Sequence, residues 1–320
     1  MADLAITLAS GDYDRTRALK EGRVSVEGCA VDYSVVEPNE LFKRNLKSQE
    51  FDVSEMSLST YVAHRAEGKA HYTAIPVFLS RAFRHSAIFV RSDRIRAPAD
   101  LKSKRVGTPE YFTTMLVWMR GLLSDEYDIA PSDLQWKLGG LEQPANPGAG
   151  NAISNVSIEH IPDGKTLSTM LADGEIDAIF SARPPSCFTK GGANVSRLFA
   201  DTRAVEQAYY RKTGVYPLMH AVGIRNRLVE QNPWLAGALF KAYVQSKEIA
   251  LADLQKLAAF SVTLPWVEAE YRATQAVLGA DIWPYGIEAN RKAIDTLCRY
   301  LAEQGFTARR MQVDELFARF

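Results

Sequence analysis

Residues 4–22 read LAITLASGDYDRTRALKEG and have the pattern of a strand followed by a helix. Leu4 to Ala9 form an apolar stretch of strand length, and the polar sequence Ser10-Gly11-Asp12-Tyr13-Asp14 ends it. Helical spacing of apolar residues follows as far as Leu19, and Gly22 closes the segment. This stretch therefore predicts a βα unit with polar side chains in the turn between its two elements.

The same alternation continues along the chain. Helical patterns separate strand patterns, which recur at residues 31–36, 51–57, 74–79, 86–90, 105–107, 176–180 and 216–224. Strands that alternate with helices imply a mainly parallel sheet covered on both faces. We therefore expect an α/β fold.

The length predicts two domains, because 320 residues exceed what one hydrophobic core usually serves. The strand pattern at 216–224 returns toward the first lobe, and the helical C-terminal part packs back on it. We expect lobe 1 to comprise residues 1–91 plus 221–320, and lobe 2 to comprise residues 92–220. The two crossings near residues 91 and 220 would form a hinge beside an interlobe ligand cleft.

Composition and charge exclude several classes of protein. Lys plus Arg equals Asp plus Glu, 38 against 38, so neither nucleic acid nor an anionic membrane is expected as a partner. The sequence contains no run of about 18 apolar residues, so we expect no membrane span. The N-terminus lacks the features of a secretory signal. Three cysteines without a close pair fit a reducing compartment, so we expect a cytoplasmic protein.

Polar residues that follow the predicted strands are the candidates for a site, because ligands of open α/β sheets bind beyond the carboxyl ends of the strands. They are Tyr13, Glu55, Ser57, Arg81, Arg84, His85, Thr108, Glu110, Tyr111, Arg183 and His220. No clustered His and carboxylate set predicts a metal site, and no phosphate-binding or Gly-x-Ser-x-Gly motif is present. Residues 139–152 are rich in Gly, Pro and Asn, which predicts a long loop.

Three arginines are the natural receptors for a carboxylate, because a guanidinium fork pairs both oxygens at once. Arg183 either binds ligand or is a surface residue. Of Arg81 and Arg84, we expect one to bind ligand and the other to be structural. Residues Thr108 to Tyr111 precede a predicted helix, whose free N–H groups would form either an anion site or a plain helix cap.

His85 and His220 are the strongest general acid–base candidates, although a lone histidine near a strand end is more often a core residue. Glu55 is either a proton donor with a raised pKa or an ion-pair partner. Glu110 either caps the helix or accepts a phenol proton. Tyr13 and Tyr111 either stack on an aromatic ligand or pack in the core.

Several segments resemble the 4,5-dihydroxyphthalate decarboxylase family. The segment IPVFLSRAFRHS at residues 75–86 resembles the hinge of that family. Similar segments are FDVSEMSLS at 51–59, GTPEY at 107–111, LSDEY at 123–127, WPYG at 283–286 and YLAEQGF at 300–306. Their order and spacing extend the resemblance over nearly the whole chain.

The resemblance implies a type II periplasmic-binding-protein-like fold and a carboxy-lyase of phthalate degradation. The implied reaction converts 4,5-dihydroxyphthalate, a small aromatic dicarboxylate, to protocatechuate and CO2 without a cofactor. In the mechanism that we expect, Arg81 and Arg183 hold the carboxylates. His85 or Glu55 protonates the ring carbon, and His220 handles the phenol.

Alternatives remain open at this point. The first is a non-catalytic ABC-type solute-binding protein for a small carboxylate. The second is an enzyme of other chemistry on the same fold, such as pyrimidine synthesis in thiamine metabolism. A homo-oligomer is also left open.

Overall fold

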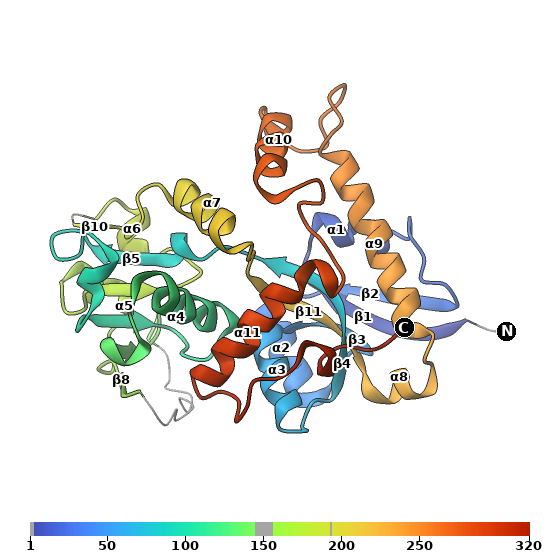
Figure 1. Ribbon diagram of the computed structural model, residues 1–320, viewed down its shortest axis with the longest axis horizontal. Helices are drawn as coiled ribbons and strands as arrows, with labels where there is room; N and C mark the ends of the chain where they lie inside the picture. Colours follow the sequence, from blue (N-terminus) through green and yellow to red (C-terminus); the bar gives the residue numbers. More distant parts are fainter. Residues whose placement is uncertain (1–2, 145–155, 193) are drawn as a thin grey trace. The chain divides into compact units, whose positions relative to one another are not determined.

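The computed structural model describes residues 3–144, 156–192 and 194–320, which form two compact units, each with its own sheet (Figure 1). Unit 1 comprises Met1–Arg81, Leu218–Asp295 and Met311–Phe320, and unit 2 comprises Ala82–Pro217 and Thr296–Arg310. These limits differ from the expected boundaries at residues 91 and 220. The strand Ile88–Arg91 belongs to unit 2 because it pairs with strands of that unit.

The sheet of unit 1 has the strand order β2-β1-β3-β11-β4. Its strands are β1 (Leu4–Ser10), β2 (Cys29–Val35), β3 (Val53–Ser57), β4 (Tyr72–Arg81) and β11 (Leu218–Arg225). β1 is parallel to β2 and β3, whereas β11 lies between β3 and β4 and is antiparallel to both. The sheet is therefore mixed, and the strand that comes last in the sequence is an interior one.

Helices cover both faces of this sheet (Figure 1). The helices of unit 1 are α1 (Asp14–Lys20), α2 (Pro38–Ser48), α3 (Leu58–Ala66), α8 (Asn226–Gln231), α9 (Leu235–Asp253) and α10 (Val267–Leu278), and α11 (Arg291–Glu303) begins there. Val53 and Val222 are buried in the core beneath α1 and α9. Glu55 and His220 lie two residues away on the same strands, so they share that face of the sheet.

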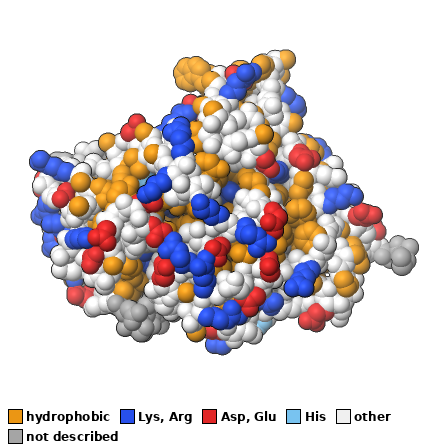
Figure 2. Space-filling view, in the orientation of Figure 1, with side chains coloured by type: hydrophobic (Ala, Val, Ile, Leu, Met, Phe, Trp, Pro, Cys, Tyr) orange, Lys and Arg blue, Asp and Glu red, His pale blue; other side chains and the backbone are white. Residues whose placement is uncertain are grey.

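The segment between α9 and α10 carries exposed apolar side chains. Leu257, Phe260, Val262, Leu264 and Trp266 are all exposed there. Figure 2 shows hydrophobic side chains at this segment and shows basic and acidic side chains interspersed over the face in view. These apolar side chains take no part in the core of unit 1.

The sheet of unit 2 has the order β10-β5-β9-β6-β7-β8. Its strands are β5 (Ile88–Arg91), β6 (Arg105–Thr108), β7 (Gln135–Leu138), β8 (Ile158–His160), β9 (Ala178–Phe180) and β10 (Val195–Arg197). Its helices are α4 (Thr114–Tyr127), α5 (Leu167–Ala172), α6 (Ser186–Thr189) and α7 (Thr202–Thr213). Of the predicted loop at 139–152, residues 145–152 lie outside the described residues. Within the described ranges, no helix combines the length and the hydrophobicity that a membrane span requires.

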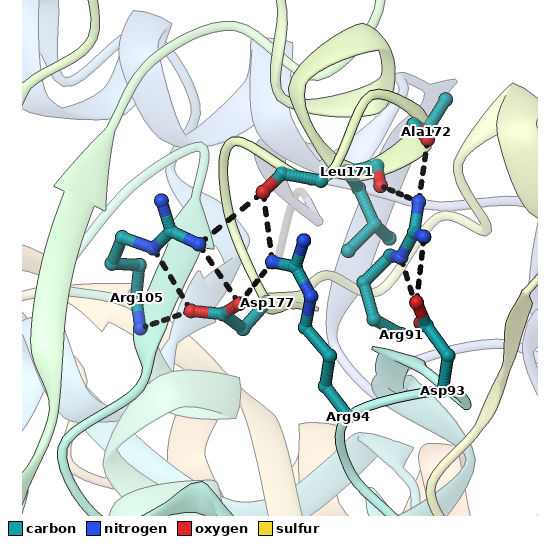
Figure 3. A network of polar contacts seen from close by, with 8 residues as sticks. Arg91, Asp93, Arg94, Arg105, Leu171, Ala172 and Asp177 are labelled. Atoms are coloured by element: carbon teal, nitrogen blue, oxygen red, sulfur yellow. Dashed lines mark hydrogen bonds and ion pairs between the residues drawn. The ribbon is translucent and has the colours of Figure 1, made fainter.

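A buried carboxylate ties the strands of unit 2 together (Figure 3). Asp177, next to β9, accepts hydrogen bonds from Arg94 Nη1 at 2.7 Å and from Arg105 Nε and backbone N at 2.9 and 3.0 Å. Burial alone would raise the pKa of Asp177, but these bonds outweigh burial and lower it to about 2. The network is therefore a structural element of this unit, and it stays ionised at neutral pH.

Candidate functional site

Glu55 and His220 meet because β3 and β11 are neighbouring strands. Glu55 is paired with Val222 and His220 with Ser57, so Glu55 and His220 are diagonal neighbours on one face. Nδ1 of His220 lies 2.7 Å from Oε1 of Glu55. Register shifts in the β11–β4 pairing occur on both sides of His220. Irregularities of this kind re-aim side chains and are frequent next to active sites.

Glu55 is completely buried, and three groups surround its carboxylate. Besides the contact with His220, the Tyr13 hydroxyl donates to Oε1 at 2.7 Å and the Gly11 N–H donates to Oε2 at 2.8 Å. Both donors come from the turn that follows β1. Burial by itself would raise the pKa of Glu55, but the contacts with His220, Gly11 and Tyr13 outweigh burial and lower it. Glu55 is therefore a carboxylate at neutral pH.

The ionised state of Glu55 determines how His220 is protonated. A carboxylate only accepts hydrogen bonds, so Nδ1 of His220 carries the proton that the two residues share. The other ring nitrogen, Nε2, is then free of a proton in the neutral ring. The edge of Phe42 packs against the ring at 4.9 Å between centroids, and the side chain of His220 is 20% exposed. His220 therefore has a fixed orientation and a solvent-accessible edge.

Tyr13 holds its proton firmly in this arrangement. Burial and the charge of Glu55 both raise the pKa of the Tyr13 hydroxyl. Because this hydroxyl donates to Glu55, its oxygen is left to accept a hydrogen bond from another group. Tyr13, Glu55 and His220 form one hydrogen-bonded cluster, and all three residues were predicted from the sequence.

Arg15 also belongs to this cluster, although sequence analysis did not identify it. Its guanidinium lies 4.2 Å from the centroid of the Tyr13 ring and 4.3 Å from that of Trp283. Arg15 is in the first turn of α1, where a basic residue usually lies on a solvated helix face. Two sequence signals lay near it: the candidate residue Tyr13, two positions earlier in the chain, and the WPYG motif at 283–286, which contributes Trp283.

Arg81 lies at the end of β4 and is buried. Its guanidinium donates to the Pro284 carbonyl at 2.5 Å and to the Asn290 side chain. These contacts hold the loop that carries Trp283 and therefore favour a structural role. A direct contact of Arg81 with ligand stays a prediction, as does one of Ser57, which lies at the N-cap position of α3 opposite His220.

Arg84 and His85 belong to unit 2. His85 is buried between Phe199 and Tyr209, with ring centroids at 5.3 and 5.4 Å. Burial lowers the pKa of His85 to about 4, so the ring is neutral at physiological pH. Burial also lowers the pKa of Arg84, to about 10, which leaves its charge in place. A neutral, enclosed imidazole disfavours the predicted role of His85 as a general acid.

The remaining predicted residues also lie in unit 2. Residues 108–111 precede a helix as expected, but α4 begins at Thr114 and its cap is Thr113 rather than one of these four residues. Thr108 is buried and donates to the Glu110 carbonyl, Tyr111 packs edge-on against Trp136, and Glu110 and Arg183 are exposed. A role for these four residues in substrate binding stays a prediction.

Within the described residues, no group of three or more His, Cys, Asp and Glu side chains could hold a metal ion. The cluster of unit 1 instead offers an oriented imidazole beside a buried carboxylate, a tyrosine hydroxyl and an arginine. This combination suits proton transfer to or from an anionic aromatic ligand.

Two curated relatives resemble the chain over most of its length. The first is 4,5-dihydroxyphthalate decarboxylase of Comamonas testosteroni, 42% identical over 326 residues, which cover 99% of this chain and 97% of that protein. The second is 4,5-dihydroxyphthalate decarboxylase of Pseudomonas putida, 41% identical over 217 residues, which cover 66% of this chain and 83% of that protein. These relatives confirm the resemblance that the sequence motifs indicated. No protein-family model matches the chain.

Among solved structures, a periplasmic sulfonate-binding protein, SsuA of Methylobacillus flagellatus, has the same fold. It matches with a TM-score of 0.56 and 15% identity, covering 99% of this chain and 92% of that chain. At this identity the likeness shows the fold alone. It confirms the predicted periplasmic-binding-protein-like class.

Proposed function

Because the chain belongs to the 4,5-dihydroxyphthalate decarboxylase family, we propose that it is a carboxy-lyase that converts 4,5-dihydroxyphthalate to protocatechuate and CO2. The observation that carries this proposal is a likeness of 42% identity that extends over 99% of the chain. The Tyr13–Glu55–His220 cluster adds a group able to move the required proton. We place the reaction in the degradation of phthalates.

The substrate itself explains why proton transfer is needed. Each carboxylate of 4,5-dihydroxyphthalate is para to a hydroxyl group. When that hydroxyl loses its proton, its electron pair moves through the ring and allows the carboxyl-bearing carbon to accept a proton. Loss of CO2 then restores the aromatic ring, and the phenol regains its proton. Overall one proton is taken up from solvent, because hydrogen replaces a carboxylate, and the ring itself accepts the electrons.

We propose that His220 exchanges a proton with the phenol, and its geometry supports this role. Nε2 is the ring nitrogen that lacks a proton, so it accepts the proton of the para hydroxyl and later returns it. Glu55 stabilises the imidazolium that forms in between and keeps the ring in one tautomer. The low pKa of Glu55 favours this orienting role over the role of carbon acid that the sequence suggested.

The location of the enzyme is also part of the proposal. We propose that it acts in the cytoplasm, since Cys29, Cys187 and Cys298 are all free thiols, as in proteins of reducing compartments.

The test is incubation of the purified protein with 4,5-dihydroxyphthalate, with and without a chelator, and chromatography of the products. We expect protocatechuate in both arms. His220→Ala should lower the rate about 10²–10⁴-fold. His71→Ala, which alters an exposed histidine of the same unit, serves as the matched control.

Two other outcomes would contradict the proposal. Saturable thermal stabilisation by the diacid without turnover would indicate the alternative, a solute-binding protein. Absence of both turnover and stabilisation would exclude this diacid as the ligand.

A further inference from the structure

The guanidinium of Arg15 packs against the Tyr13–Glu55–His220 cluster through the Tyr13 ring. The face of the Tyr13 ring contacts the Arg15 guanidinium, while the hydroxyl of the same ring contacts Glu55. Trp283 covers the guanidinium at 4.3 Å and is itself fixed by a hydrogen bond of 2.9 Å from its Nε1 to the Phe78 carbonyl. A ligand that reaches His220 along Tyr13 therefore also meets Arg15.

The guanidinium of Arg15 is held by hydrogen bonds, but these bonds do not use all of its donors. Nε and Nη2 donate to the Leu79 carbonyl, and Nη1 donates to Asp14. An arginine has five N–H groups, so two remain without a contact among the described residues. The Arg15 side chain is 16% exposed, whereas Arg81, the arginine predicted from the sequence, is 6% exposed and donates to Pro284 and Asn290.

The chemistry of the reaction indicates which carboxylate Arg15 receives. A guanidinium held against the departing carboxylate would stabilise the substrate more than the transition state, because that charge disappears as CO2 forms. Such binding would slow the chemical step. The retained carboxylate keeps its charge throughout, so binding it positions the ring without this penalty.

We propose that Arg15 receives the carboxylate that stays on the ring and thereby makes the site select a dihydroxylated aromatic acid over a plain diphenol. This inference rests on the proposed function for the identity of the substrate. The rings of Tyr13 and Trp283 both lie against the guanidinium and hold it in place, which reduces the ordering cost of a two-point contact with the carboxylate.

The experiment measures equilibrium binding of protocatechuate and of catechol, which has the same two hydroxyls and no carboxylate. The wild-type protein should prefer protocatechuate. Arg15→Met should weaken protocatechuate binding about 10- to 100-fold and leave catechol binding within about twofold. Arg15→Lys should restore part of the preference, because it keeps the charge and loses the fork. Arg17→Met, on an exposed residue of the same helix, is the matched control.

The kinetic counterpart is a rise in KM for 4,5-dihydroxyphthalate in Arg15→Met with kcat within about threefold. An equal loss of affinity for both ligands would show a structural role and overturn the inference. An unchanged preference for protocatechuate in Arg15→Met would overturn it as well. A wild-type protein that prefers protocatechuate but gives no turnover would contradict the proposed function, while the binding data still decide the role of Arg15.

Discussion

Glu55→Gln is the substitution that most directly tests how the site works. It keeps the shape of the side chain and removes its charge. An amide oxygen in the place of Oε2 can still accept from the Gly11 N–H, which puts the NH2 group in the place of Oε1. That NH2 group then faces Nδ1 of His220 and donates to it, so the ring proton moves to Nε2. Nε2 can no longer accept a proton from the substrate.

The opposite orientation of the amide would keep the competent tautomer of His220, because the amide oxygen would then accept from Nδ1. The NH2 group would, however, face the Gly11 N–H, and two buried donors would oppose each other at a cost of about 1–3 kcal/mol. The first orientation, with the inactive tautomer, is therefore favoured, and neither orientation supplies the charge that stabilises the imidazolium. We expect kcat to fall about 10²–10⁴-fold, the range in which general-base catalysis and its orienting carboxylate contribute.

The assay is steady-state decarboxylation of 4,5-dihydroxyphthalate together with equilibrium binding of protocatechuate. A positioning role predicts a loss in kcat with KM and product affinity within about threefold, because Glu55 does not touch the ligand. Glu67→Gln, which alters an exposed carboxylate of unit 1, should behave like the wild type. A kcat of Glu55→Gln within about threefold of wild type would refute this account of His220. So would an equal loss of kcat and of product binding.

Three further predictions concern stability and the other candidate residues. His85 has a pKa of about 4, below its unfolded value, so it disfavours folding as the pH falls from about 6.5 toward 4. We therefore expect the change that His85→Phe makes in the free energy of unfolding to be about 2 kcal/mol more favourable at pH 5 than at pH 7.5. Urea titrations at the two pH values measure this difference, and kcat should not fall. A kcat reduced more than about tenfold would return His85 to the mechanism. The low pKa of Asp177 contributes stability above about pH 4 that is lost as the pH falls toward 2. Asp177→Asn should destabilise the protein by about 1–2 kcal/mol at pH 7, and the difference should vanish near pH 2; a difference that is independent of pH would contradict this origin. Arg81→Met should lower the free energy of unfolding by about 2–3 kcal/mol through the lost contacts to Pro284 and Asn290. Unchanged stability with a strong loss of substrate affinity would instead make Arg81 the carboxylate receptor.

Much of the fold could be predicted from the sequence, because its signals are local. The apolar strand at 4–9 and the polar turn after it correspond to β1 and the turn that positions Tyr13. The strand pattern at 216–224 corresponds to β11. The fold class and the family followed from such local patterns and from short motifs distributed along the chain.

The assignments within the site could not be predicted because they depend on contacts between distant residues. Glu55 and His220 are 165 positions apart, and only the insertion of β11 beside β3 brings them together. The low pKa of Glu55 depends on this contact, so the sequence left open whether it donates a proton. His85 follows a strand, as a site residue would, but its ring points into an aromatic core.

The place of β11 in the sheet also constrains how the nascent chain folds on the ribosome. The partners of β11 are β3 and β4, yet the 136 residues of Ala82–Pro217 are synthesised between β4 and β11. Until residues 218–225 emerge, β3 and β4 each lack their native neighbour and have open edges that can pair with other chains. Synthesis that stops before residue 218 therefore leaves an aggregation-prone half-sheet without His220. The strand that completes the Tyr13–Glu55–His220 cluster is the same strand that completes the sheet of unit 1.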